Sequence, residues 1–337
     1  MNASRATEKT DLSVSATPRA NAGHGGLGAP AFQMHGAMRL GAPTLRIRDL
    51  PTALRFYTNV MGLRIGGKGR DRNDDLETVE LGFGGNPAEP LLVLKGDQGA
   101  KQPPKGAAGL YHYAFLVPDR KSLASTFVAL GEKGLQYEGF ADHQVSESLY
   151  LHDVERNGIE IYADRPRSQW PEWRKISAEF AATGDASLIA PLTQPLDIDS
   201  VLAQLSAREK TSPSAFPRGA RIGHVHLRVT NLERSVRFYN EKLGLDIMMN
   251  LGPIGAAFLS AGGYHHHFGL NTWHSLGGSP HREGEAGLEE VKVIVPDKGV
   301  LKALEGQFDD PLTEKGAMIV RDPDGARISI VAATPES

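Results

Sequence analysis

The sequence predicts an α+β fold in which four modules of the form βαβββ are arranged as two domains. Three observations lead to this class. The first two are that long segments of the chain repeat one another and that the pattern of each repeat predicts a strand, a helix and further strands. The third observation is size, because 337 residues, of which 40% are hydrophobic, can bury two domain-sized cores.

The first repeat joins two segments that align without gaps. LRIRDLPTALRFYTNVMGLRI (45–65) shares Leu-Arg, Leu, Arg-Phe-Tyr and Gly-Leu with LRVTNLERSVRFYNEKLGLDI (227–247). Each copy opens with an alternating strand, and Asp49 or Asn231 then serves as the predicted N-cap of a helix. A glycine stands near each predicted helix end: Gly62 in the first copy and Gly244 in the second.

A second pair of segments repeats further along the chain. AGLYHYAFLVPD (108–119) matches AGLEEVKVIVPD (286–297), and DVERNGIEI (153–161) matches DPDGARISI (322–330). The chain therefore contains four modules in the order A, B, A′, B′. We number them 1 to 4, and they span about residues 38–99, 106–166, 219–274 and 284–333.

These modules predict the domain organisation. Residues 1–37 have no apolar run and no strong period, which indicates a flexible tail and not a signal peptide. Modules 1 and 2 form a first predicted domain at 38–166, and modules 3 and 4 form a second at 219–335. Residues 167–218 between them are predicted to be a linker, in which DIDSVLAQLSA (197–207) forms a short amphipathic helix. The two tryptophans of the linker, Trp170 and Trp173, should pack on the surface.

Composition excludes several classes of protein. The formal net charge is -3 and no long basic run is present, so neither nucleic acid nor membrane is an expected partner. The chain has no cysteine, which removes disulfides, thiolate nucleophiles and sulfur-ligated metals together. Any bound metal must therefore use His, Asp or Glu, and a cytoplasmic location is the default expectation.

Three stretches carry a resemblance to a known family: SLYLHDVERNGIEIYADRP (148–166), IGHVHLRV (222–229) and GGYHHHFGLNTW (262–273). With the four modules, they resemble the vicinal oxygen chelate (glyoxalase-like) superfamily, and within it the type I extradiol dioxygenases of the catechol 2,3-dioxygenase kind. The resemblance covers about residues 38–333. It implies an Fe(II)-dependent enzyme of aromatic hydrocarbon catabolism. Such an enzyme inserts O2 into a small aromatic diol beside its hydroxyls, gives a ring-opened semialdehyde, and is expected to be a homo-oligomer.

The resemblance also implies a metal site. Its ligands would be His112 and His224, on the first strands of modules 2 and 3, and Glu160, on the last strand of module 2. Two histidines and one carboxylate suit Fe(II) and leave positions open for substrate, and Mn(II) is the alternative because these ligands distinguish the two metals weakly.

Three further residues take catalytic roles by the same resemblance. Tyr150 precedes Glu160 by ten residues and would donate a hydrogen bond to a substrate oxygen. His266, in the triple-histidine run on the predicted last strand of module 3, would be the acid–base group, and strand alternation would turn His265 and His267 to the opposite face. His143, whose spacing departs from the usual one, would add a polar group.

One departure from the family decides which modules should pair. The better-known relatives build the site from modules 3 and 4, but here module 4 has Glu290 and Ser329 where His and Glu would stand. We therefore predict that module 2 pairs with module 3 and module 1 with module 4, within one chain or by exchange between subunits. The alternative keeps modules 3 and 4 together and uses His224, one histidine of the run, and Glu290.

Other interpretations of the same residues stay open from sequence. A lone histidine such as His112 is more often structural than a ligand, and Glu160 could face solvent from a half-buried strand. His226 shares a strand face with His224 and could compete for the metal, and the triple histidine could be a chance cluster. A glyoxalase-type isomerase, usually with four protein ligands, and a metal-free bleomycin-resistance-like binder are the rival functions.

Overall fold

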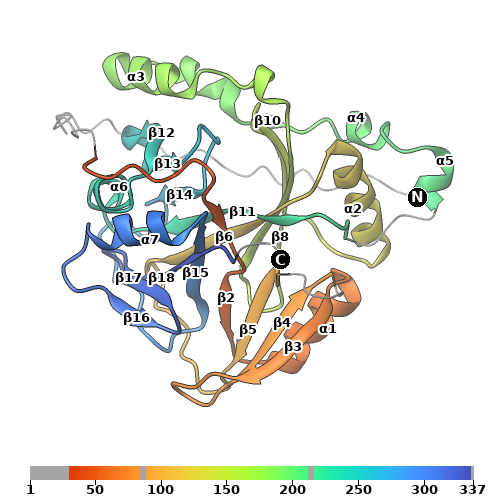
Figure 1. Cartoon of the computed structure of the whole chain (residues 1–337). Coiled ribbons are helices and arrows are strands. Elements are labelled where there is room, and N and C mark those ends of the chain that lie inside the picture. Colours follow the sequence, from red (N-terminus) through yellow and green to blue (C-terminus); the bar gives the residue numbers. More distant parts are fainter. Residues whose placement is uncertain (1–29, 84–88, 212–215, 335–337) are drawn as a thin grey trace.

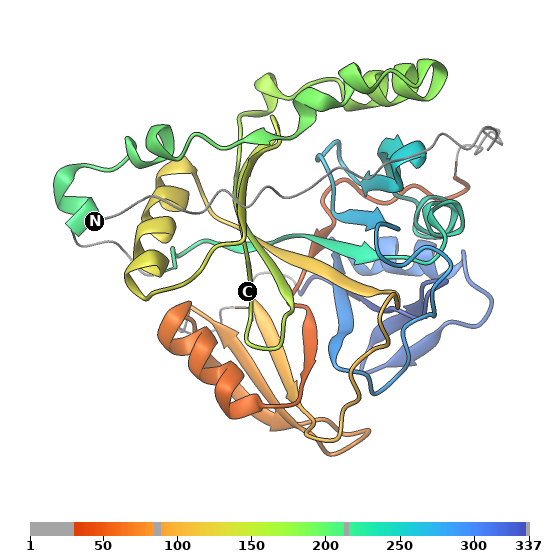
Figure 2. The same cartoon turned by 180° about the vertical axis from the view of Figure 1, so that it is seen from behind.

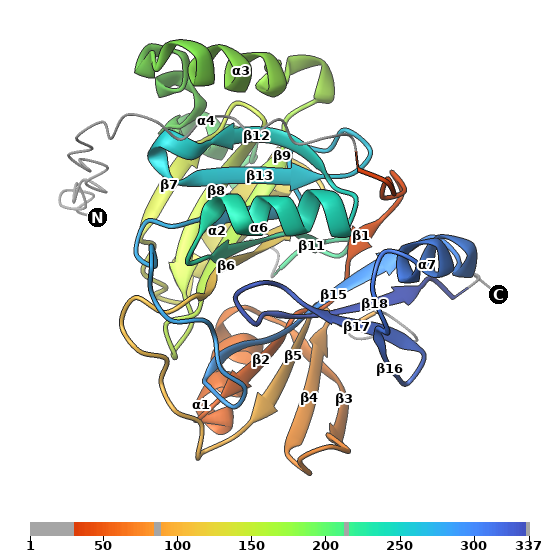
Figure 3. The ribbon, with the colours of Figure 1, turned by 90° about the vertical axis from the view of Figure 1, so that its left-hand side faces the viewer.

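The computed structural model describes residues 30–83, 89–211 and 216–334, so the predicted tail lies outside the described residues as far as residue 29. The described chain forms two nine-stranded sheets that mix parallel and antiparallel pairs. Figure 3 shows one sheet above the other, and Figures 1 and 2 show helices packed around both. The predicted α+β class is confirmed.

Modules 2 and 3 form one sheet, which we call the 2–3 sheet. Its strands are β6 (Gly109–Leu116), β7 (Gly139–Asp142), β8 (Ser146–His152), β9 (Gly158–Asp164), β10 (Gln194–Pro195), β11 (Arg221–Arg228), β12 (Asp246–Leu251), β13 (Ala256–Ser260) and β14 (Phe268–Asn271). Their order is β10-β7-β8-β9-β6-β11-β14-β13-β12. The first strands of the two modules, β6 and β11, meet antiparallel at its centre.

Modules 1 and 4 form the second sheet, the 1–4 sheet. Its strands are β1 (Arg39–Leu40), β2 (Thr44–Ile47), β3 (Arg64–Arg70), β4 (Glu77–Gly82), β5 (Leu92–Gly96), β15 (Gly287–Val295), β16 (Leu312–Glu314), β17 (Ala317–Arg321) and β18 (Arg327–Ala332). Their order is β16-β17-β18-β15-β2-β5-β4-β3, with β1 paired to β15. Again the two first strands, β2 and β15, meet antiparallel at the centre.

The predicted module pairing is confirmed, and it occurs within one chain. The alternative, in which modules 3 and 4 share a sheet, is wrong because β11 and β15 belong to different sheets. The division into domains at 38–166 and 219–335 remains a prediction.

The repeated helices begin and end where the sequence predicts. Asp49 caps α1 (Leu50–Arg55) by accepting a hydrogen bond from Thr52 N, and Asn231 caps α6 (Leu232–Arg237) in the same way. Each helix continues as a five-residue π-helical turn, Phe56–Val60 or Phe238–Lys242, so the duplication is visible even in this irregularity. The other module helices are α2 (Arg120–Glu132) and α7 (Lys298–Glu305).

Two buried turns tie the sheets together. Tyr57 of module 1 donates a hydrogen bond to Asp153 Oδ2 in the β8–β9 turn at 2.8 Å. Tyr239 of module 3 donates to Asp322 Oδ2 in the β17–β18 turn at 3.2 Å. Each Phe-Tyr repeat thus connects a helix of one sheet to a turn of the other.

The predicted linker carries its own helices. These are α3 (Trp173–Thr183), α4 (Ile198–Leu202) and α5 (Ala207–Thr211), with 3-10 turns at Arg167–Gln169, Ala186–Leu188 and Ala190–Leu192 and a further turn at Gly252–Ile254 in module 3. The helix expected near residue 198 is α4. The expectation that Trp173 packs on the surface is wrong, because it is buried with Phe180 and Met249, and Trp170 is half-buried. The linker also adds β10 to the 2–3 sheet.

In the described chain, no helix is both long and apolar enough to cross a membrane.

Candidate metal centre

Three side chains converge at the centre of the 2–3 sheet. His112 Nε2 lies 3.2 Å from His224 Nε2, and each of these atoms lies 3.0 Å from Glu160 Oε2. All three residues are buried, with at most 6% of their surface exposed. Among the described residues, this is the one group of three or more His, Asp or Glu side chains whose ligand atoms converge so closely.

The three residues meet because their strands are neighbours. β6 lies between β9 and β11, in parallel register with β9 and antiparallel to β11. A register shift on β11 leaves Gly223 unpaired, and a Cβ atom at this glycine would stand 1.8 Å from Tyr162 Oη. The tyrosine hydroxyl fills that space and bonds to Tyr264 Oη at 2.6 Å. The glycine before His224 is therefore required by packing.

The protonation states suit metal binding. Burial would raise the pKa of the Glu160 carboxyl, but the nearby His224 and His112 hold it well below its usual range. Burial lowers the pKa of His224 to about 4. Ser148 donates a hydrogen bond at 2.7 Å to Glu160 Oε1, which leaves Oε2 facing the histidines. An ionised carboxylate and a neutral imidazole are the forms that coordinate a metal.

The spacing of these atoms fits one metal ion. Ligand atoms about 2.1 Å from an ion and at right angles to each other are about 3 Å apart, close to the observed separations. A divalent metal here would be held by two histidines and one carboxylate on one side.

Tyr150 and His143 lie beside the three ligands. Tyr150 is the cross-strand partner of Glu160, and its ring centroid is 5.7 Å from that of His112. His143 Nε2 lies 2.7 Å from Tyr150 Oη, while its Nδ1 lies 3.2 Å from Thr193 Oγ1. Burial raises the pKa of Tyr150 well above its usual range and lowers that of His143. The structure thus brings the weakest of the sequence candidates, His143, next to Tyr150.

The triple histidine divides into three environments. His265 Nε2 lies 2.9 Å from Asp164 Oδ1, and His267 Nδ1 lies 2.8 Å from Ser260 Oγ. His266 packs against the ligands, with its ring centroid 4.1 Å from that of His224. The run precedes β14 and does not lie on the strand, contrary to the sequence expectation, because the chain turns from β13 at Gly262 and Gly263, both in the left-handed region.

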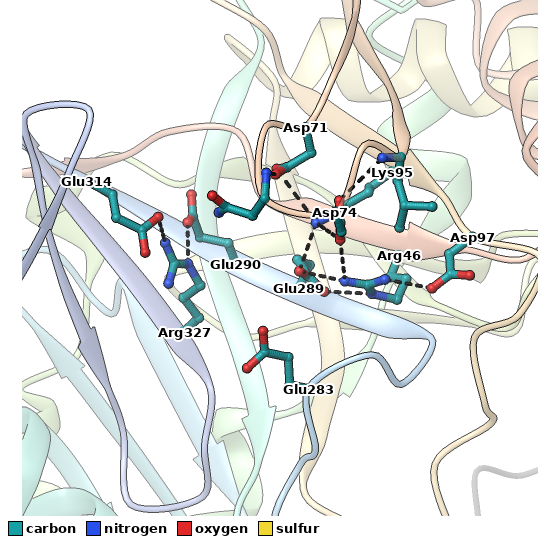
Figure 4. Close-up of polar contacts among 12 residues, drawn as sticks. Arg46, Asp71, Asp74, Lys95, Asp97, Glu283, Glu289, Glu290, Glu314 and Arg327 are labelled. Atoms are coloured by element: carbon teal, nitrogen blue, oxygen red, sulfur yellow. Dashed lines mark hydrogen bonds and ion pairs between the residues drawn. The ribbon is translucent and has the colours of Figure 1, made fainter.

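Glu290 and Ser329 lie on the other sheet. Ser329 donates a hydrogen bond to Glu290 Oε1 at 2.7 Å, and Arg327 Nε binds Glu290 Oε2 at 2.9 Å. Figure 4 shows Glu290 and Glu314 on either side of this arginine. The alternative ligand set with His224 and Glu290 is therefore not assembled.

Three further residues contact the site but were not predicted from the sequence. Ser148, which binds Glu160, could have been found from its position two residues before Tyr150 on the same strand face. Trp173 packs 6.3 Å from His266 between ring centroids, but it comes from the linker, so no local pattern places it there. Tyr111 packs 5.3 Å from the His112 ring.

The chain matches a known family and a named relative over most of its length. The profile of the Glyoxalase/Bleomycin resistance protein/Dioxygenase superfamily matches residues 39–161 and 221–330. Over 264 residues the chain is 38% identical to a Bacillus subtilis (strain 168) protein named catechol-2,3-dioxygenase, covering 78% of this chain and 85% of that one.

Two solved structures share the fold. A putative dioxygenase from Bacillus subtilis subsp. subtilis str. 168 is similar with a TM-score of 0.57 at 12% identity, covering 90% of this chain and 87% of that one. Glyoxalase I from Zea mays is similar with a TM-score of 0.51 at 18% identity, covering 88% and 92% of the two chains. At such identities the likeness concerns the fold alone.

Proposed function

This chain belongs to the Glyoxalase/Bleomycin resistance protein/Dioxygenase superfamily, and from that premise we propose that it is an Fe(II)-dependent extradiol dioxygenase. Its reaction would insert O2 into a catechol beside the two hydroxyls and give a ring-opened semialdehyde. The identity with a catechol-2,3-dioxygenase supports this reaction class.

One observation carries the proposal: the buried convergence of His112, His224 and Glu160. A two-histidine, one-carboxylate set leaves several coordination positions free for substrate. Fe(II), or Mn(II) as the alternative metal, would supply Lewis acidity and redox chemistry to the diol and O2. The ligand group in the described chain has three members, which favours the dioxygenase over an isomerase with four protein ligands.

The residues around the three ligands would transfer the protons of the bound diol and orient the substrate. The Nδ1 atom of His266 lies 2.8 Å from Nδ1 of His265, which leaves Nε2 to take up and return a proton of the bound diol. Tyr150 would donate its hydroxyl proton to a substrate oxygen, while His143, at hydrogen-bond distance, fixes the direction of that hydroxyl. Trp173 of α3 packs over His266 and would limit access of water to this side.

Metal analysis followed by oxygen uptake tests the proposal. Protein loaded anaerobically with Fe(II) should retain about one iron per chain, as one ligand set predicts. Adding catechol to this protein in aerated buffer should consume one O2 per ring-opened product, followed by absorbance. Protein that retains no iron and consumes no oxygen with catechol would contradict the proposal. A cytoplasmic location and a homo-oligomer remain parts of this proposal, and size-exclusion chromatography checks the second.

A further inference from the structure

The repeat places one arginine at the same position in each sheet. Arg46 on β2 and Arg228 on β11 both follow the leucine of the shared Leu-Arg pair. Each lies at the equivalent place in the ladder, where β2 pairs with β15 and β11 pairs with β6. The two side chains are nevertheless in opposite electrostatic situations.

All three guanidinium nitrogens of Arg46 bind carboxylate oxygens. Its Nε and Nη2 atoms bind the two carboxylate oxygens of Glu289 at 2.8 and 2.9 Å, and Nη1 binds Asp97 at 2.6 Å. Lys95 joins the same cluster through Glu289 at 3.3 Å and Asp74 at 2.7 Å. Figure 4 shows these side chains converging on the arginine. We call this group the Arg46 network.

A β-bulge directs Glu289 towards Arg46. The pairing of β15 with β2 skips Glu289 between Leu288 and Glu290. The same shift occurs in the other sheet, where the pairing of β6 with β11 skips Tyr111. A bulged residue turns its side chain to the face of its neighbour. Tyr111 accordingly packs on His112 and His226, with ring centroids 5.3 and 5.1 Å away.

Three charged residues around Arg46 are matched by uncharged residues around Arg228. Tyr111 stands for Glu289, Trp273 for Asp97 and Asn271 for Lys95, as the repeat alignment and the β-ladders show. Among the described residues, none forms a hydrogen bond or ion pair with Arg228, and its Nε atom is buried without a partner. Burial lowers the pKa of Arg228.

Two more polar groups beside Arg228 have no hydrogen-bond partner among the described residues. They are His226 Nε2 and both amide atoms of Asn271, in residues 4% and 0% exposed. Asn271 is the registered neighbour of Arg228 on β14, so both side chains leave the same sheet face. His226 precedes Arg228 by two residues and lies on that face as well. Buried polar groups are normally paired, so three together indicate a ligand.

These groups adjoin the metal ligands. Residues two apart on a strand are about 6.6 Å apart, so His224, His226 and Arg228 form one row. The His226 ring centroid is 5.0 Å from that of His112. Trp273, 36% exposed, packs 5.8 Å from His226 and marks the outer end of the row. A flat ring held by its diol at His224 would extend along this row.

We propose that Arg228, His226 and Asn271 bind a carboxylate carried by the catechol ring on the side away from its two hydroxyls. This inference rests on the proposed ring-cleaving function and names its substrate class, a carboxylated catechol. A guanidinium holds a carboxylate through two parallel hydrogen bonds, as Arg46 holds Glu289. The Asn271 amide and the His226 ring add further polar partners, and Tyr111 and Trp273 provide flat walls.

Substrate competition tests the carboxylate pocket. The ratio of kcat/KM for 3,4-dihydroxybenzoate to that for catechol should exceed 10 in the wild type, and Arg228→Met should lower it about 10- to 100-fold. Tyr111→Glu should lower it as well, because the new carboxylate would occupy Arg228 as Glu289 occupies Arg46. Arg64→Met removes an exposed arginine from the 1–4 sheet and should leave the ratio unchanged.

Equilibrium binding separates this inference from the proposed function. Benzoate should bind the iron-loaded protein under nitrogen at least about 10-fold more tightly than benzamide, and Arg228→Met should abolish the difference. Cleavage of catechol with no preference for benzoate or dihydroxybenzoate would overturn the carboxylate pocket and leave the dioxygenase intact. A benzoate preference that depends on Arg228, in an iron-loaded protein that cleaves neither catechol nor 3,4-dihydroxybenzoate, would support the pocket and overturn the dioxygenase.

Discussion

The 2–3 and 1–4 sheets share one architecture but differ in how their buried charged side chains are paired. In the 1–4 sheet, Arg46 and Arg327 are each bound by at least two carboxylates, so the buried charges compensate one another. In the 2–3 sheet, the equivalent strands carry the His112, His224 and Glu160 cluster and the unpaired Arg228.

Matched positions show how few changes separate the two. Glu160 corresponds to Ser329, and His112 corresponds to Glu290. In place of metal ligands, the 1–4 sheet therefore has a hydrogen bond from Ser329 to Glu290 and an ion pair between Glu290 and Arg327. In the duplicated fold, one copy thus carries the proposed site, and the matched positions of the other form ion pairs. A polar side chain that is unpaired in one sheet, while its matched residue in the other sheet is paired, is therefore a candidate for binding a ligand.

The largest expected effect is on metal retention. Glu160→Ala should lower iron affinity by more than about 100-fold and abolish oxygen uptake with catechol, because it removes the only anionic ligand of the set. Glu290→Ala, the equivalent change in the 1–4 sheet, should leave the iron content unchanged. Iron per chain after desalting measures both, and the reverse result would place the metal in the 1–4 sheet.

The next comparison concerns stability. Arg46→Met should reduce the free energy of unfolding by about 2–3 kcal/mol, because it leaves half-buried Asp97 without its cation and half-buried Glu289 with Lys95 alone. Arg228→Met removes a cation that has no partner among the described residues, so unfolding should change by less than about 1 kcal/mol. Urea denaturation of the metal-free proteins measures both, and equal losses would contradict the assignment of Arg228 as unpaired.

A smaller effect separates catalysis from metal binding. Tyr150→Phe should lower kcat for catechol about 10- to 100-fold while iron content stays unchanged, because it removes a donor to substrate and no ligand. Tyr137→Phe is the control, since that hydroxyl donates to Phe127 O, outside the site. Loss of iron in Tyr150→Phe would indicate a structural role instead.

The smallest effect lies in the turn of module 4. Burial raises the pKa of Asp322 to about 6, from 3.8 in the unfolded chain. The folded state therefore binds more protons between these values, and the free energy of unfolding should fall by about 1–3 kcal/mol as pH rises from 4 to 6.5. Asp322→Asn should flatten this dependence in urea titrations at several pH values. An unchanged slope would show that other groups cause it.

Much of the site was predictable because its residues occupy repeat positions. The repeat indicated the bounds of the four modules and the helix caps Asp49 and Asn231. It also showed that Glu160 in module 2 is matched by Ser329 in module 4. That contrast, together with Glu290 in place of a histidine in module 4, predicted the pairing of module 2 with module 3, which the sheets confirm. The place of His266 in a loop was missed, because the alternation assumed for a strand does not hold through the turn before β14.

By itself, the sequence determined which side chains could form a ligand set, because strand periodicity and duplication are local properties of the chain. Only the tertiary structure decided that the pairing occurs within one chain, that Trp173 covers His266, and that Tyr111 turns towards Arg228. These depend on register, on a single skipped residue and on contacts between segments far apart in sequence. A one-residue shift reverses which face a side chain occupies, and no local pattern specifies it.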